Sequence, residues 1–259
     1  MNSAFEVPIV KRLEPASGHV ELLVDSPVLA QGKPGQFCHI LTPGTLRRPV
    51  SFSRLEPSTG LAGLLIQVVG SGTRWLSDRQ VGDTLDVLGP LGRGFAPPRL
   101  DRPWLLVGGG TGIPPIYAAL QAWRDQVSEP VAVVLGAKTR DALIMVKDVR
   151  QLGFEAELTT DDGSQGRFGT VMAPVQEWLA AHPRSQVWAC GPTPMLRALH
   201  GATQGLSGPV QLALEQRMGC GIGACLACVV PAQPESPDGP AYRRVCTDGP
   251  VFEREELAF

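Results

Sequence analysis

Four cysteines near the C-terminus constrain this chain more than any other feature of its sequence. Cys220, Cys225 and Cys228 fall within nine residues. Cys246 follows after a longer gap. The resulting spacing, C-x4-C-x2-C…C, is typical of the plant-type thiolates that hold a [2Fe–2S] cluster. Because such a cluster takes one electron at a time, the pattern predicts that this chain transfers electrons.

The residues between these cysteines are small, as a loop that wraps a cluster requires. Gly221 and Gly223 can take positive φ angles, which lets the backbone turn its N–H groups toward the sulfurs. Two other uses of four cysteines stay open. A structural zinc site usually has two separated C-x2-C pairs, which is not the spacing here. Two disulfides would fit a secreted protein, but the first residues lack a basic stretch followed by an apolar run.

Length and composition exclude several classes of protein. The 259 residues are enough for two domains or one large one. The formal net charge is −2 and no basic block occurs, so nothing favours binding to nucleic acid or to a membrane surface. No apolar run reaches the roughly 18 residues that a transmembrane helix needs. Six cysteines in a chain without a signal peptide indicate metal or redox use in a reducing compartment, which predicts a cytoplasmic protein.

Residues 1–100 predict a small antiparallel β-barrel. Short apolar segments alternate there with turn signals such as Gly32–Gly35 and Pro57–Gly60. Several short strands at this spacing are typical of a barrel. The expected strands are Val20–Val24, Gln36–Leu41, Val50–Arg54, Leu64–Val69 and Thr84–Leu88.

Residues 101–214 change to strands that alternate with helices, which predicts a doubly wound parallel sheet. The expected strands are Trp104–Val107, Val131–Leu135, Phe154–Thr159, Gln186–Ala189 and Val210–Leu214. The expected helices are Ile116–Trp123, Val171–Ala181 and Met195–Leu199. Residues 215–259 are expected to form a third module that bears the cluster. Its Pro- and Gly-rich segment Pro231–Pro240 is expected to join two strands of a hairpin between the third and fourth cysteines.

A glycine-rich turn, Gly108-Gly-Gly-Thr-Gly112, follows the first of these strands and opens a helix. Its glycines let the backbone approach a phosphate, and the N-terminus of the helix favours an anion. The motif is not G-x-G-x-x-G, so it leaves the ligand open. Cys190-Gly191-Pro192 follows a later strand and is expected at the same carboxyl edge of the sheet, where open α/β sheets bind ligands. Cys190 alone is either a small buried residue or a functional thiol.

Two segments of the barrel offer groups for a phosphorylated cofactor. Arg48-Pro49-Val50-Ser51 carries a guanidinium, which suits bidentate contacts to phosphate, and a nearby hydroxyl. Gly70-Ser71-Gly72-Thr73 offers a flexible turn with free N–H groups. Each signal is weak alone, because an arginine on a strand is usually solvated or paired. Together the two segments could hold the two ends of one cofactor.

In this order, the motifs resemble those of ferredoxin-reductase-type flavoproteins, and the resemblance spans essentially the whole chain. The glycine motifs identify only that superfamily. The segments Glu215–Cys228 and Arg244–Phe252 resemble one subfamily more closely. That subfamily is the electron-transfer subunits of the two-subunit, NAD-linked (class 1B) dihydroorotate dehydrogenases.

The resemblance implies the positions of two nucleotide cofactors. FAD would lie against the barrel, with Arg48 at its pyrophosphate, Ser51 near the flavin ring and Gly70–Thr73 at further phosphate contacts. NAD would be bound by Gly110-Thr111-Gly112 and by Cys190-Gly191-Pro192, with Cys190 near the nicotinamide ring. The resemblance also implies that no catalytic acid or base need come from this chain.

Val50 stands where many reductases have an aromatic residue, and the subfamily also has an aliphatic one there. The implied FAD site therefore lacks aromatic stacking at this position. Asp161 and Asp162 either shape the nucleotide site or form a solvated turn. The segment Gly136–Asp141 holds both basic and acidic residues, so it does not decide between NAD and NADP. The resemblance favours NAD.

The implied activity is that of an oxidoreductase subunit in pyrimidine biosynthesis. A nicotinamide exchanges a hydride and a cluster takes one electron, so a flavin must stand between them. Electrons would pass from dihydroorotate through FMN of a partner catalytic subunit to the cluster, to FAD and to NAD+. The implied assembly is a heterotetramer with two copies of each subunit.

Three other functions stay open. The small subunit of another NAD(P)-linked flavoprotein complex, of the ferredoxin:NADP or sulfide type, would share the same motifs. A ferredoxin-like carrier would keep the nucleotide domain only as a scaffold. A zinc-stabilised interaction protein would be colourless.

Overall fold

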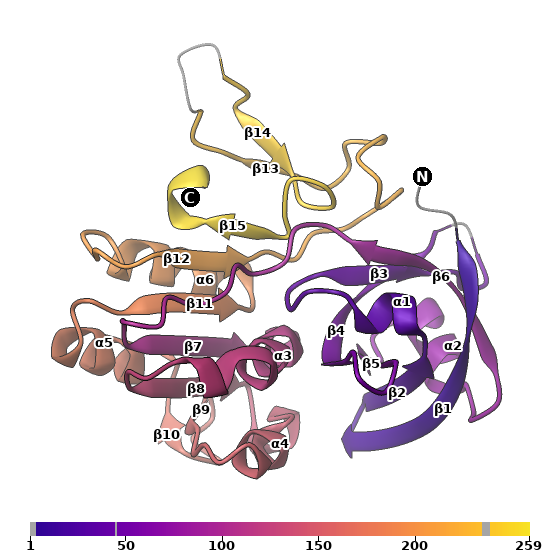
Figure 1. Ribbon diagram of the computed structural model, residues 1–259, viewed down its shortest axis with the longest axis horizontal. Helices are drawn as coiled ribbons and strands as arrows, with labels where there is room; N and C mark the ends of the chain where they lie inside the picture. The colour runs from indigo at the N-terminus through magenta and orange to yellow at the C-terminus, as the bar shows by residue number, and fades with distance from the viewer. Residues whose placement is uncertain (1–3, 45, 235–238) are drawn as a thin grey trace.

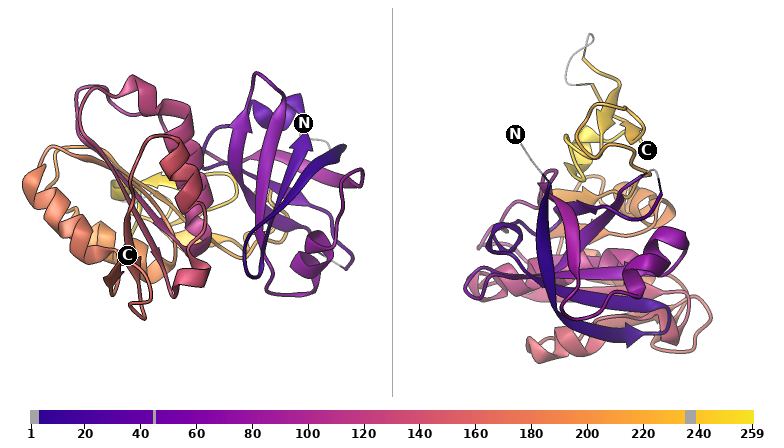
Figure 2. Two further views of the ribbon diagram at one scale, coloured as in Figure 1. Left: turned by 90° about the horizontal axis from the view of Figure 1, so that it is seen from below. Right: turned by 90° about the vertical axis from the view of Figure 1, so that its right-hand side faces the viewer.

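The computed structural model describes residues 4–44, 46–234 and 239–259. Figure 1 shows a barrel, a sheet flanked by helices, and a C-terminal hairpin and loop that lie above both. The left view of Figure 2 shows the barrel and the sheet next to each other, and the right view shows the C-terminal hairpin projecting from them.

Six antiparallel strands close into the barrel in the order β1-β2-β5-β4-β3-β6, which confirms the predicted antiparallel barrel. The strands are β1 (Phe5–Ala16), β2 (His19–Asp25), β3 (Phe37–Ile40), β4 (Arg48–Glu56), β5 (Leu61–Gln67) and β6 (Thr84–Leu91). Two short helices, α1 (Pro27–Ala30) and α2 (Ser71–Ser77), lie between strands. The expectation of a flexible turn at Gly70–Thr73 was wrong, because Gly70 is the N-cap of α2 and Ser71–Thr73 are its first residues.

Seven strands form the second sheet in the order β10-β9-β8-β7-β11-β12-β15. The strands are β7 (Trp104–Gly109), β8 (Val131–Ala137), β9 (Glu157–Thr160), β10 (Arg167–Phe168), β11 (Gln186–Cys190), β12 (Val210–Ala213) and β15 (Val251–Glu253). All neighbouring strands are parallel except β12 and β15. The α-helices of this part are α3 (Ile113–Trp123), α4 (Val146–Gln151), α5 (Met172–Ala181) and α6 (Thr193–Ala202). The short 3-10 helices are η1 (Gly110–Gly112), η2 (Arg124–Gln126), η3 (Arg140–Ala142) and η4 (Arg254–Glu256).

Helices cover both faces of this sheet. Leu105 and Val107 of β7 belong to an apolar cluster with α5 and α6, whereas Trp104 and Leu106 belong to one with α3 and α4. Successive side chains of a strand point to opposite faces, so β7 is buried on both. The predicted doubly wound parallel sheet is therefore confirmed.

The C-terminal residues are partly a module of their own and partly an edge of this sheet. Strands β13 (Val229–Pro231) and β14 (Tyr242–Arg244) pair as the predicted hairpin, although residues 235–238 within Pro231–Pro240 lie outside the described ones. Strand β15 pairs antiparallel with β12. The division of the chain at 100/101 and 214/215 stays a prediction, because one strand from the expected third part completes the sheet of the second.

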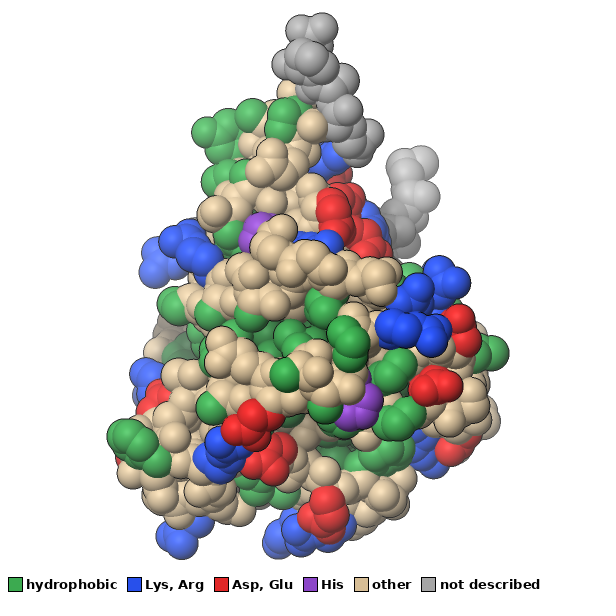
Figure 3. All heavy atoms as spheres, turned by 90° about the vertical axis from the view of Figure 1, so that its left-hand side faces the viewer, with side chains coloured by type: hydrophobic (Ala, Val, Ile, Leu, Met, Phe, Trp, Pro, Cys, Tyr) green, Lys and Arg blue, Asp and Glu red, His purple; other side chains and the backbone are tan. Residues whose placement is uncertain are grey.

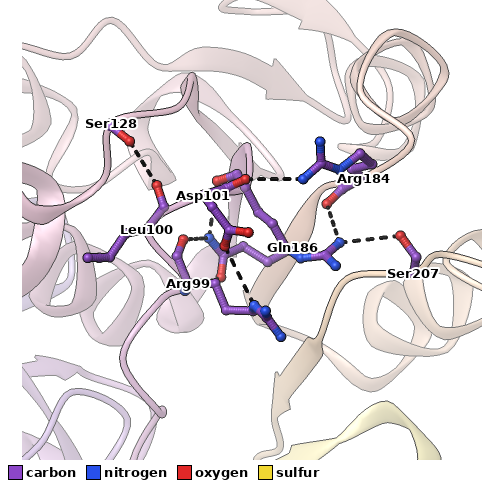
Figure 4. A network of polar contacts seen from close by, with 8 residues as sticks. Arg99, Leu100, Asp101, Ser128, Arg184, Gln186 and Ser207 are labelled. Carbon is purple, nitrogen blue, oxygen red and sulfur yellow. Dashed lines mark hydrogen bonds and ion pairs between the residues drawn. The ribbon is translucent and has the colours of Figure 1, made fainter.

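The buried amide side chain of Gln186 holds the linker between the barrel and the sheet, residues 92–103 (Figure 4). The side chain of Gln186 is wholly buried. Its Oε1 accepts from the N–H of Arg99 at 2.8 Å, and its Nε2 donates to the carbonyl oxygens of Arg99 at 2.8 Å and Arg102 at 3.3 Å. Arg102 donates in turn to Ser207 Oγ at 3.3 Å. The linker is therefore fixed to the sheet along its length.

A second polar network joins the barrel directly to helices α3 and α4, which cover one face of the parallel sheet. Arg54 of β4 donates from Nε to Glu21 Oε1 at 2.9 Å and from Nη2 to Asp148 Oδ1 of α4 at 2.5 Å. Its Nη1 also donates to the hydroxyl of Tyr117 on α3 at 3.3 Å. The Glu21 side chain is only 2% exposed, so this is a buried ion-pair network.

Within the described ranges, none of the helices is both long and apolar enough to cross a membrane. Basic and acidic side chains are both distributed over the face in Figure 3, in agreement with the near-neutral net charge.

Candidate redox site between the barrel, the sheet and the cysteine loop

A cavity lies between the barrel and the carboxyl edge of the sheet, and all three parts of the chain line it. The predicted site residues that line it are Pro49, Val50, Ser51, Thr73, Thr111, Gly112, Cys190 and Gly191. The other predicted residues, which adjoin it in the chain, are Arg48, Gly70, Ser71, Gly72, Gly110 and Pro192. The structure therefore brings the barrel motifs and the sheet motifs to one place.

Arg48 at the start of β4 lies beside α2. A Cβ on Gly72 would be 2.5 Å from Arg48 Nε, so the guanidinium lies close against the backbone of α2. The Arg48 guanidinium donates to the carbonyl oxygen of Leu46 at 2.9 Å, and it has no ion-pair partner among the described carboxylates. Its positive charge can therefore hold an anion such as a phosphate beside the backbone of α2.

The two motifs of the sheet also meet. A Cβ on Gly112 would be 2.2 Å from the carbonyl oxygen of Cys190 and 2.5 Å from the N of Gly191. Gly110 has a φ of 52°, in the left-handed region that favours glycine. The glycine-rich turn and the Cys190–Pro192 segment are therefore packed too closely for any residue but glycine at position 112. Together they could hold a nucleotide across the ends of both strands.

Cys190 lies in the cavity wall as a protonated thiol. Burial raises its pKa, and the nearby carboxylate of Glu215 raises it further. A thiol with a raised pKa is a poor nucleophile. The position of Cys190 therefore suits contact with a ligand rather than covalent catalysis.

The cysteine loop turns its backbone N–H groups toward sulfur, as its glycines predicted. Gly221 and Gly223 have φ angles of 72° and 82°. The N–H groups of Ile222, Ala224 and Cys225 donate to Cys220 Sγ at 3.5, 3.3 and 3.4 Å, and that of Gly223 donates to Cys246 Sγ at 3.2 Å. Such hydrogen bonds stabilise negative charge on sulfur and tune the potential of a bound cluster.

Backbone hydrogen bonds link the four cysteines as two pairs, since the N–H of Cys225 donates to Cys220 Sγ and that of Cys246 to Cys228 Sγ, each at 3.4 Å. Burial raises the pKa of Cys220, but backbone N–H groups and the Cys225 side chain lower it more, to about 6. Burial and the Cys228 thiol raise the pKa of Cys246 to about 11. In the described ranges, no three His, Cys, Asp or Glu side chains are gathered for a single metal ion. Two thiol pairs with N–H donors suit a two-iron cluster better than one tetrahedral zinc.

The cavity and the thiols share a wall. Met218 lines the cavity, and Cys220 follows two residues later in the chain. Phe37 of β3 also lines the cavity and belongs to the same buried apolar cluster as Cys228 and Cys246. A ligand in the cavity would therefore lie next to whatever the four thiols hold.

Some lining residues were missed from the sequence, namely Phe37, Gln67, Glu215, Gln216 and Met218. Two signals could have found three of them. Gln67 ends the strand just before the Gly70 motif. Glu215 and Gln216 come shortly after the end of β12, at the carboxyl edge of the sheet, where such folds bind ligands.

Asp161 and Asp162 lie at the end of β9 and are exposed. The Oδ1 of Asp162 accepts hydrogen bonds from the N–H and the hydroxyl of Ser164 at 3.0 and 2.6 Å, and these lower its pKa. Neither aspartate lines the cavity. The geometry favours the solvated turn.

Comparison with protein families agrees with this arrangement. A family described as the iron–sulfur cluster binding domain of dihydroorotate dehydrogenase B matches residues 215–258. A family described as the oxidoreductase NAD-binding domain matches residues 106–201.

Solved structures show the same fold. A chain of an NADH-dependent reduced ferredoxin-NADP oxidoreductase is 32% identical, with a TM-score of 0.83 over 100% of this chain and 91% of its own. A ferredoxin reductase of carbazole 1,9a-dioxygenase is 24% identical, with a TM-score of 0.70 over 81% of this chain and 68% of its own, and shares the fold. Fold and site together define an oxidoreductase of the ferredoxin-reductase type.

Curated relatives narrow this class. The electron transfer subunit of dihydroorotate dehydrogenase B (NAD(+)) from Bacillus caldolyticus is 42% identical over 87% of this chain and 86% of its own length. The corresponding subunit from Geobacillus thermodenitrificans is 40% identical over 92% and 91%. The chain belongs to this family of electron transfer subunits of dihydroorotate dehydrogenase B.

Proposed function

We propose that this chain passes electrons between a partner dihydroorotate dehydrogenase subunit and NAD+, with FAD and a [2Fe–2S] cluster as its resident redox groups. The physiological direction is from dihydroorotate to NAD+. When bound, FAD exchanges a hydride with the nicotinamide and single electrons with the cluster. The protein's own residues bind these groups, orient them and exclude water.

The barrel side of the cavity holds FAD. Arg48 neutralises phosphate charge, and the segment Gly70-Ser71-Gly72-Thr73 adds backbone N–H donors beside it. Pro49 and Val50 provide an apolar wall, and Ser51 offers a hydroxyl to the ring system. The fit is supported by the Arg48 guanidinium, which has no ion-pair partner among the described carboxylates and lies close against the backbone of α2 at Gly72.

The sheet side of the cavity holds the nicotinamide nucleotide. Gly110-Thr111-Gly112 provides the close backbone approach that a pyrophosphate needs. Cys190-Gly191-Pro192 lies against this turn, and Cys190 is placed at the nicotinamide end. The four thiols of Cys220, Cys225, Cys228 and Cys246 hold the cluster in the third part of the site.

The proposal rests mainly on the wall that the cavity and the four thiols share. The chain runs from the cavity-lining Met218 to the cluster ligand Cys220 with one residue between them. A nucleotide-binding cavity beside a set of cluster thiols serves electron transfer, whereas a carrier or a zinc-stabilised module has no use for it.

The partner is proposed to be an FMN-containing catalytic subunit, in a cytoplasmic assembly with two copies of each chain. Apolar side chains around the cysteine loop support a docking surface there. Ile222, Leu226 and Tyr242 are 54%, 59% and 61% exposed. Large exposed apolar side chains beside a redox centre are suited to a protein partner.

The test is dihydroorotate-dependent NAD+ reduction by the complex that co-purifies with this chain from its native cells, with NADP+ measured in parallel. Activity with NAD+ is expected and would fix partner, nucleotide and direction together. A complex that is reduced by NADH or NADPH but does not oxidise dihydroorotate would refute the dihydroorotate assignment.

A second candidate rests on the solved structure at 32% identity, whose title describes an NADH-dependent reduced ferredoxin-NADP oxidoreductase. In that case this chain would serve a complex with another catalytic partner and reduced ferredoxin as a substrate. Reduced-ferredoxin-dependent formation of NADPH by the purified complex would favour this candidate.

A further inference from the structure

His39 is a buried polar side chain on β3 that binds neither nucleotide in the arrangement above. The residue is 0% exposed. Neither Nδ1 nor Nε2 has a hydrogen-bond partner in the described part of the chain. A buried polar group left without a partner destabilises the folded protein. Such a group therefore calls for a reason.

The barrel contacts the cysteine loop, residues 220–228, through the outer face of β3. Cys38 and Ile40 point into the barrel core, so Phe37 and His39 point out of it. Phe37 packs in the apolar cluster that contains Cys228 and Cys246. Its ring meets the His39 ring edge-on, with 6.5 Å between centroids.

The His39 ring lies directly against the first turn of the cysteine loop. A Cβ on Gly221 would be 2.6 Å from His39 Nδ1 and 3.1 Å from its Cε1. Burial lowers the pKa of His39, the Cys220 backbone raises it, and Arg47 and Arg48 lower it. The ring therefore lies against the peptide that joins Cys220 to Gly221, although neither ring nitrogen forms a complete hydrogen bond there.

We infer that His39 is a positioning residue that anchors the cysteine loop to the barrel, by donating from Nδ1 to the backbone carbonyl oxygen of Cys220 when the loop holds its cluster. This inference rests on the proposed cluster site. The anchor ties the first ligand to the strand that also carries the cavity-lining Phe37. It therefore fixes the distance between cluster and cavity, and it accounts for both the orphaned nitrogen and the glycine at 221.

Two substitutions distinguish the effect of the His39 ring nitrogen from the effect of the shape of the ring. His39→Phe keeps a ring and removes both nitrogens. His39→Asn removes the ring and keeps an N–H donor near the place of Nδ1. In the purified protein loaded with FAD and cluster, iron release to a chelator and the cluster's midpoint potential, from an EPR-monitored titration, are the two measurements.

We expect His39→Phe to release iron about tenfold faster, the factor that one lost hydrogen bond supplies. We also expect a changed midpoint potential in this variant, because hydrogen bonds around the sulfurs set it. His39→Asn is expected to stay close to the unaltered protein in both measurements. Unchanged iron release and potential in His39→Phe would overturn the anchor. Equal damage in both variants would overturn it too, since ring shape would then be what matters.

FAD content is the internal control, because His39 does not line the cavity. Normal cluster content in a Cys246→Ser variant would instead refute the proposed cluster site. The two failures are therefore distinguishable.

A double-mutant cycle tests the same contact if His39→Phe does not fold. Gly221→Ala and His39→Ala should be coupled, because the added Cβ and the ring compete for one space. Gly223→Ala is the matched control, since its φ is also positive but its Cβ would meet Thr247 at 3.0 Å. Coupling to His39→Ala that is no larger at 221 than at 223 would refute the contact.

Discussion

Cys246 stands alone in the sequence, yet the fold returns it to the other three cysteines. Its side chain is buried, and its N–H donates to Cys228 Sγ at 3.4 Å. The hairpin of β13 and β14 makes this return, since Val229 pairs with Arg244 just before the fourth cysteine. A ligand delivered by a hairpin is separable from the barrel that faces the flavin side of the cavity.

Cys246→Ser is therefore expected to lose most of the cluster while FAD stays bound. A serine hydroxyl is a poor substitute for a thiolate ligand to iron. Iron, sulfide and flavin per chain measure the effect. Cys38→Ala is the matched control, because Cys38 is wholly buried in the barrel core away from the loop, and it should keep its iron. Full iron content in Cys246→Ser would refute the ligand assignment.

Arg48→Ala is expected to act on the opposite cofactor. A hydrogen bond to a charged group contributes about 1.5–3 kcal/mol, so FAD affinity should fall by roughly 10- to 100-fold. Titration of the flavin-free protein with FAD measures this. Arg74→Ala, an exposed arginine on α2, should leave FAD affinity unchanged. Equal affinities in the two variants would show that Arg48 does not contact the phosphate.

The role of a residue could be predicted where the spacing of residues in the sequence indicates it. It could not be predicted where the role depends on a contact between distant parts of the chain. The cysteine spacing predicted the loop, and Gly221 and Gly223 within it predicted its positive φ angles. His39 offered no such signal, because nothing in the sequence places it beside Gly221, 182 positions further on. Met218 likewise looks like an ordinary core residue until the cavity is seen.

At the scale of elements, glycines set how closely α3 and β11 can approach. Gly112 at the start of α3 leaves no space for a Cβ beside the Cys190 carbonyl. Overpacking of this kind typically costs about 1–3 kcal/mol. The close approach therefore depends on a single hydrogen atom in place of a side chain.

Gly112→Ala is expected to lower the melting temperature and to weaken NAD+ binding, since the turn must move away from β11. Gly201→Ala on α6 is the control, because its Cβ would meet no atom within 4 Å and alanine favours a helix. That variant should be as stable as the unaltered protein or more so. Thermal unfolding and NADH titration check both. Native affinity in Gly112→Ala would argue against a nucleotide at this turn.

The ion-pair network at Arg54 links strands of the barrel to helices of the neighbouring domain. Removing one partner of a buried pair leaves an uncompensated charge, at a cost of about 3–5 kcal/mol. Arg54→Met should therefore lower the free energy of unfolding by about this amount. Urea unfolding followed by tryptophan fluorescence measures it. Arg150→Met, which breaks an exposed pair with Glu155, should have no measurable effect. Similar losses in the two variants would contradict a structural role for the network.

Element prediction succeeded where hydrophobic periodicity was regular and failed where polar residues interrupt it. Strand β1 was missed because Lys11, Arg12 and Glu14 break the alternation of a strand that curves around the outside of the barrel. Helix α2 was hidden because Gly70-Ser71-Gly72 is a turn signal. The edge strand β15 could not be assigned to a sheet, since its partner β12 lies 38 positions earlier, counted from Val251 to Ala213.

At the scale of the whole molecule, the cysteine loop stands at an apolar surface. Leu226 has a φ of 57°, and its side chain is 59% exposed. A large apolar residue held in the left-handed region and exposed to water is unfavourable for the isolated chain. A partner subunit that covers the Leu226 side chain would remove the cost of its exposure to water.

Leu226→Asp should weaken association with the partner while the cluster stays bound. Aspartate tolerates the left-handed backbone better than leucine, so the variant adds a charge without adding strain. Co-purification and size-exclusion chromatography measure association. Phe168→Asp is the control, because Phe168 is 79% exposed on β10 at the opposite edge of the sheet. Undiminished association of Leu226→Asp would place the partner elsewhere.

The single residue between the cavity wall and the first thiol also limits how the chain can change in length. An inserted residue lengthens a chain path by up to about 3.5 Å. Between Met218 and Cys220 that extra length would fall wholly between the cavity wall and the first thiol. At the exposed turn around Gly82, where a side chain would meet open space, the same insertion would change little. Natural length variation is therefore expected to collect at turns such as Gly82, while the step from Met218 to Cys220 keeps its one-residue spacer.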